Sequence, residues 1–124
     1  MQKHEFNEYA DYAIIDDIFH ITYKDNIVLN LPAAVQIVKD RLSIQEGRFM
    51  PVLCDIRKIK SINKAARGYL SIEGSILVTA VAFIIDSPVS EMLSEFYLKT
   101  SKPPIPTRSF NNVQDALLFL KEFK

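Results

Sequence analysis

Residues 78–88 read VTAVAFIIDSP, and this stretch decides the fold. Its first eight residues are apolar except for Thr79 and show no alternation with polar residues. That pattern is typical of a strand covered on both faces. Asp86 and Ser87 can then cap a helix, and Pro88 fits the first turn of that helix. A buried strand that leads directly into a helix indicates a sheet flanked by helices.

Strands and helices alternate on both sides of this stretch. The predicted strands are residues 12–15, 18–23, 51–56, 78–85 and 107–110. The predicted helices are residues 31–46, 64–74, 88–101 and 113–123. The first two strands are separated by Asp16 and Asp17, which is the spacing of a β-hairpin, although the turn lacks the usual glycine. This order predicts an α/β fold with a mixed sheet, helical cover and right-handed crossovers.

The helical periodicity also predicts which side chains face the core. For the first helix these are Leu31, Ala34, Val35, Val38 and Leu42. For the second helix they are Ala66, Tyr69 and Leu70. Gly68 inside the second helix costs about 1 kcal/mol relative to alanine, so we expect close packing against a neighbour there.

The third predicted helix carries a wide apolar arc. Its apolar side chains are Val89, Met92, Leu93, Phe96, Tyr97 and Leu98. Two interpretations remain open for this arc. Either the chain buries it in its own core, or part of it is exposed and covered by a second copy in a homodimer.

Composition limits the class of protein. The chain has 124 residues, of which 48% are apolar and 24% are charged. This length and apolar content suffice for the core of one ordinary domain over residues 1–124, without a metal or disulfide. Its 15 basic and 15 acidic residues cancel, so bulk charge gives no argument for nucleic acid. The single cysteine, Cys54, lies in an apolar run and is predicted to be buried and unreactive. No signal peptide or membrane-spanning segment is visible, so we expect a cytoplasmic protein.

Residues suited to catalysis or metal binding are few. The two histidines, His4 and His20, are far apart in sequence, whereas metal sites need three or four clustered ligands. There is no G-x-S-x-G nucleophile motif, and three glycines are too few for a glycine-rich phosphate loop. We therefore expect no enzyme activity, no catalytic residue, no metal and no cofactor.

A cluster of cations follows the 51–56 strand. Residues 57–67 include five basic residues and no acidic one. Asp55 and Arg57 lie at the carboxyl end of that strand, where open α/β sheets place ligands. Asp55 either braces the following loop or positions Arg57 for a partner. Lys64 and Arg67 begin a helix capped by Asn63, where the helix dipole disfavours cations and a bound anion would offset that cost.

The predicted binding residues are therefore Asp55, Arg57, Asn63, Lys64 and Arg67. The alternative is that these cations form only a solvated face.

Three segments, taken with the order of elements, resemble a known family. They are PVLCDIR at 51–57, Ser87–Pro88, and KPPIPT at 102–107. They resemble small STAS-like (SpoIIAA-like) bacterial domains of uncharacterised function, similar to anti-sigma-factor antagonists. The resemblance implies a sheet of about five strands with four helices and an opening hairpin, and a domain that binds partners without a cofactor.

The chain departs from this family at one place. Antagonists of the switching type carry a phosphorylatable serine at the start of the second helix. Residues 62–66 here read INKAA, and Ser61 precedes the predicted cap. We therefore expect no phosphorylation switch at this helix.

Two function classes remain open. The first is a non-catalytic regulatory domain that binds a protein partner or a second copy of itself. The alternative is a domain that binds a small anionic ligand or a lipid headgroup near Arg57 and Lys64. A ligand binder should contain an enclosed cavity of ~300 Å3 or more, whereas an interaction module should present a flat surface.

Overall fold

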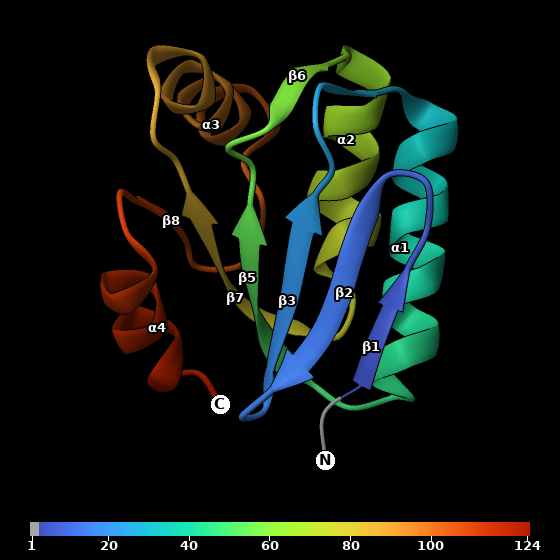
Figure 1. Ribbon diagram of the computed structural model, residues 1–124, viewed down its shortest axis with the longest axis vertical. Helices are drawn as coiled ribbons and strands as arrows, with labels where there is room; N and C mark the ends of the chain where they lie inside the picture. The colour runs from blue at the N-terminus through green and yellow to red at the C-terminus, as the bar shows by residue number, and fades with distance from the viewer. Residues whose placement is uncertain (1–2) are drawn as a thin grey trace.

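A six-stranded mixed sheet forms the centre of the fold, which a computed structural model describes over residues 3–124 (Figure 1). In spatial order its strands are β1 (Lys3–Phe6), β2 (Ala10–Ile15), β3 (Ile18–Tyr23), β5 (Met50–Asp55), β7 (Val78–Ile84) and β8 (Thr107–Phe110). The first three strands are antiparallel, and β3, β5, β7 and β8 are parallel. The predicted mixed sheet and opening hairpin are confirmed. β1 is an additional strand that was not predicted, because its polar sequence KHEF has no apolar pattern.

Four α-helices accompany the sheet, as predicted. They are α1 (Leu31–Gln45), α2 (Lys64–Ile72), α3 (Pro88–Ser101) and α4 (Val113–Lys121), with a short 3-10 helix, η1 (Glu73–Ser75), after α2. Each α-helix begins at a side-chain cap, and the capping residues are Asn30, Asn63, Ser87 and Asn112. A separate pair of parallel strands, β4 (Ile27–Leu29) and β6 (Ile59–Ile62), leads into α1 and α2.

The hairpin turn closes without glycine. Asp16 and Asp17 have φ angles of 53° and 61°, so both residues adopt the left-handed conformation. A two-residue turn with positive φ at both positions matches the right-handed twist of the flanking strands, and aspartate tolerates this region better than most residues. The turn therefore fixes the register in which Ile15 lies opposite Ile18.

The two faces of the sheet are covered unequally. The larger core lies on one face, where Tyr12, Phe19 and Val52 pack with Ile37 of α1. On the other face Leu53, Ala82 and Ile84 pack against Ala116 and Leu120 of α4. Because α4 lies over β5, β7 and β8, most of β2 and β3 on that face has no helix over it within residues 3–124 (Figure 1).

The predicted core face of α1 is partly wrong. Ala34 and Val38 are buried, but Leu31 and Val35 are exposed. The helix buries Arg41 and Gln45 in addition to its apolar residues. Periodicity alone missed this, because the apolar stripe continues through two polar positions that find hydrogen-bond partners inside the protein.

The apolar arc of α3 is buried only in part, so the interpretation that the chain buries all of it in its own core is wrong. Tyr97 is buried, and its ring contacts Phe83 edge-to-face at 5.6 Å. However, the rest of the buried side consists of Ser90 and Ser94. The Ser94 hydroxyl accepts a 3.0 Å hydrogen bond from the hydroxyl of Ser109 in β8. The larger apolar residues at 89, 92 and 96 lie on the exposed side of the helix.

Gly68 does not pack closely, contrary to the prediction. A Cβ atom at this position would meet no atom within 4 Å. The glycine lies on the exposed side of α2, so packing does not require it.

Candidate functional site

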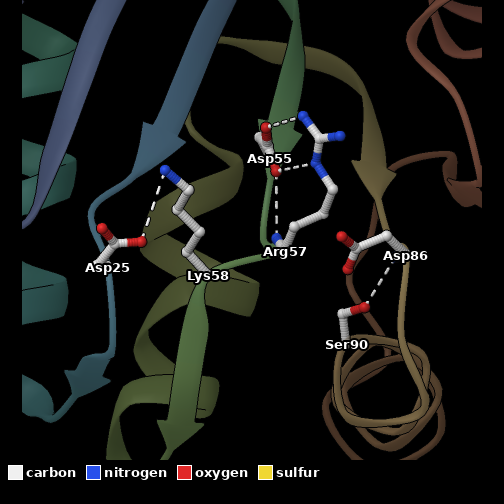
Figure 2. Close-up of polar contacts among 6 residues, drawn as sticks. All are labelled: Asp25, Asp55, Arg57, Lys58, Asp86 and Ser90. Carbon is white, nitrogen blue, oxygen red and sulfur yellow. Dashed lines mark hydrogen bonds and ion pairs between the residues drawn. The ribbon is translucent and has the colours of Figure 1, made fainter.

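Asp55 and Arg57 form a two-pronged ion pair at the carboxyl end of β5 (Figure 2). The Arg57 Nε–H donates to Asp55 Oδ1 at 3.0 Å, and Nη2 donates to Oδ2 at 2.7 Å. The backbone N–H of Arg57 also donates to Oδ1 at 3.1 Å. Asp55 therefore both braces the loop and orients the guanidinium. This hydrogen bonding raises the pKa of Arg57.

Acidic residues from other loops lie beside the cation cluster. Asp86, which follows β7, adds a second favourable charge near Arg57. Its backbone N–H donates to Ser90 Oγ at 3.0 Å, which turns the chain into α3 (Figure 2). The Lys58 amine lies 3.5 Å from a carboxylate oxygen of Asp25. Residues 57–67 contain no acid in sequence, but in the folded chain two of their five cations, Arg57 and Lys58, have acidic neighbours.

The start of α2 contains the other predicted site residues. Asn63 caps the helix, and its side-chain oxygen accepts the backbone N–H of Ala66 at 2.9 Å. Lys64 is exposed and makes no hydrogen bond or ion pair with any described residue. Arg67 turns back to donate to the carbonyl of Ile62 at 2.9 Å, and its guanidinium lies 4.4 Å from the centre of the Phe96 ring.

The contact between Arg67 and Phe96 joins two features that the sequence presented separately. Phe96 belongs to a stripe on α3 with Val89 and Met92, at three- and four-residue spacing. These side chains are 49% (Val89), 62% (Met92) and 47% (Phe96) exposed. Cation–π contacts of this kind hold an arginine over an aromatic face. We define the α2–α3 surface by the residues Lys64, Arg67, Val89, Met92 and Phe96.

A buried arginine on α1 was missed in the sequence. Arg41 is only 2% exposed. Its guanidinium donates to the side chain of Gln45 and to the carbonyls of Ile76 (3.0 Å) and Gly74 (3.1 Å). Burial lowers the pKa of Arg41 to about 10, so it remains charged at neutral pH. The sequence did contain a signal for this burial, because Arg41 follows Ile37 by four residues and therefore lies on the same apolar stripe of α1.

The large core contains a cavity of about 80 Å3 between the sheet and helices α1, α2 and α3. Tyr23, Cys54 and Tyr97 are among the residues that line it. The volume is well below the ~300 Å3 at which ligand pockets begin. Burial raises the pKa of the Cys54 thiol to about 12, so the thiolate nucleophile is not available near neutral pH. The prediction that Cys54 is a buried core residue is confirmed.

The described residues contain neither a cluster of metal ligands nor a membrane-spanning helix. No group of three or more His, Cys, Asp or Glu residues in the described part of the chain could hold a metal ion. His20 is described, whereas the side chain of His4 lies outside the described residues. Over residues 3–124, no helix has the length and apolar character needed to cross a membrane.

Comparison with known proteins supports the fold. No curated protein matches the sequence. A crystal structure of an uncharacterised protein of the DUF3478 family, from Shewanella loihica PV-4, is similar to this chain and has a SpoIIAA-like fold. The two are 18% identical with a TM-score of 0.58, over 97% of this chain and 92% of that one.

The SpoIIAA-like resemblance seen in the sequence is therefore confirmed at the level of fold. The family model described as a domain of unknown function (DUF7793) matches residues 12–124, and the chain belongs to that family.

Proposed function

We propose that this chain is a non-catalytic regulatory domain that binds a protein partner through the α2–α3 surface. The observation that carries the proposal is the exposed stripe of Val89, Met92 and Phe96 with Arg67 stacked beside it. Aromatic residues, methionine and arginine are enriched at protein interfaces, and a desolvated aromatic centre with a polar rim is the usual arrangement of a hot spot. Lys64 supplies that rim.

The partner that fits first is a second copy of the chain. The stripe runs along one helix, so two α3 helices can meet around a twofold axis, with each stripe covering the other. Arg67 would then lie at the edge of the shared apolar strip and keep its contact with Phe96. The protein is accordingly proposed to be a homodimer.

Light scattering at micromolar concentration tests this arrangement. The expected mass is about twice 14.2 kDa. Met92→Glu should give a monomer, because it places a charge in the centre of the stripe. Leu118→Glu is the matched control, since Leu118 on α4 is 66% exposed and lies outside the α2–α3 surface. A clean monomer for the unmodified chain rejects the homodimer.

A second candidate function is binding of a small anion or a lipid headgroup. The observation in its favour is that Lys64 lies in the first turn of α2 without a partner among the described residues. Phosphate titration tests it, because an anion that binds only the folded chain must raise the melting temperature. The rise should disappear in the double variant Arg57→Ala with Lys64→Ala. If tens of millimolar phosphate leave the melting temperature unchanged, this function is rejected.

A further inference from the structure

An open groove of about 610 Å3 lies on the opposite face of the sheet from α1 and α2. One wall is the end of the β2–β3 hairpin, with Ile15, Ile18 and His20. The other wall is α4, with Leu117, Leu118 and Lys121. In Figure 1 the hairpin turn and the C-terminus, which follows α4, lie close together. The groove exists because α4 packs over β5, β7 and β8 and leaves the hairpin side of this face open.

The accessible lining of the groove is mainly apolar. Ile18 is already buried, so the apolar surface open to a ligand comes from the partly exposed Ile15 and from Leu118, which is 66% exposed on α4. Burying one such side chain in a bound apolar group gains about 1.5–3 kcal/mol. The groove volume also falls within the range of roughly 300–1,000 Å3 found for small-molecule sites. An apolar chain of moderate length would therefore be held here.

The rim of the groove is cationic. Lys124 forms an ion pair with Asp16 at 3.0 Å, and Asp16 is the one acidic residue among those that line the groove. Lys121 has no ion pair with any described residue. The half-buried His20 imidazole makes no hydrogen bond within the described part of the chain, and burial lowers its pKa, which favours the neutral ring. The positive charge of Lys121 thus lies without a paired carboxylate among the lining residues, beside the apolar lining of the groove.

We propose that this groove binds a free amphiphile with a single apolar chain and an anionic head, of the carboxylate class. The apolar chain lies on Ile15 and Leu118, and the head pairs with Lys121. Charge complementarity selects an anion, because the groove keeps a net positive charge after Asp16 is paired. The site lies on the other face from the α2–α3 surface, so it can exist whether or not that surface binds a partner.

Dodecanoate, below its micelle concentration, is the probe. Calorimetric titration should show one site. In NMR spectra, the imidazole resonances of His20, assigned with a His20→Gln variant, should shift as dodecanoate is added. Leu118→Glu should weaken binding at least about tenfold. Lys121→Gln should weaken it about two- to fivefold, and uncharged dodecanol should bind more weakly than dodecanoate.

Ile72→Glu at the end of α2 is the matched control, because Ile72 is exposed to a similar degree (62%) and lies outside both the groove and the α2–α3 surface. It should leave dodecanoate binding unchanged. The proposal is overturned if millimolar dodecanoate does not bind, or if it binds without shifting the His20 resonances. Binding that survives Leu118→Glu, or that is lost in Ile72→Glu, also overturns it, since the probe would then occupy another surface. Equal affinity for dodecanol would refute the anionic head.

Discussion

Replacing Gly68 by alanine should stabilise the protein. Gly68 lies in the interior of α2, where glycine is about 0.5–1 kcal/mol less favourable than alanine because of its greater freedom in the unfolded chain. A new Cβ at this position meets nothing within 4 Å, so no steric cost offsets the gain. The expected change is an increase of about 0.5–1 kcal/mol in the free energy of unfolding. For a chain of this length, that corresponds to a rise of roughly 2–5 °C in melting temperature.

Urea denaturation followed by circular dichroism measures this change. Gly47→Ala is the control, because Gly47 has a φ of +78°, where alanine is strained. That variant should lose about 1–2 kcal/mol, although it introduces the same methyl group into open space. A loss of stability in Gly68→Ala would show that the glycine is needed for packing after all and would refute the reasoning.

Three further outcomes are expected. Arg41→Met should destabilise the fold by roughly 3–5 kcal/mol in urea, because the buried carbonyls of Gly74 and Ile76 lose a charged donor; a loss under about 1 kcal/mol would contradict this role. The pKa of Cys54 rises on folding from its ordinary value of 9.0 to about 12, so the folded state keeps a proton that the unfolded chain loses. The stabilisation that this proton gives is fully present below pH 9, and the free energy of unfolding then falls as the pH rises toward 12, by up to about 1.4 kcal/mol per pH unit. Between about pH 9 and 10, the urea midpoint of Cys54→Ala should therefore fall less than that of the unmodified chain. Intact-mass analysis of protein from native cells should find no regulatory phosphate at the start of α2, and a phosphate on Ser61 that controls partner binding would contradict that.

Features that depend on neighbouring residues could be predicted from the sequence. The caps at Asn63 and Ser87 were predicted correctly, because a cap needs only its own helix to act. The β2–β3 hairpin follows from two apolar segments at two-residue spacing. The link between Asp55 and Arg57 also spans only two residues.

Features set by distant contacts could not be predicted. β1 is a strand because it pairs with β2, and its own sequence carries little strand preference. Arg41 can be buried because the carbonyl oxygens of residues 74 and 76 accept hydrogen bonds from its guanidinium. The side of α3 that faces the sheet is selected by contacts such as that of Ser94 with Ser109 in β8. Asp86 and Asp25, which lie beside Arg57 and Lys58, likewise come from loops that are distant in the sequence.

The strand order has a consequence for the kinetics of folding. β2 and β3 pair across a two-residue turn, and such a hairpin can form within microseconds. β5 cannot join β3 until α1 has folded back, because their partners Phe19 and Val52 lie on either side of that helix in the chain. Pairing between distant parallel strands is slow. During refolding, the apolar β5 and β7 should therefore stay unpaired longest, so aggregation that increases with protein concentration should begin with these two strands.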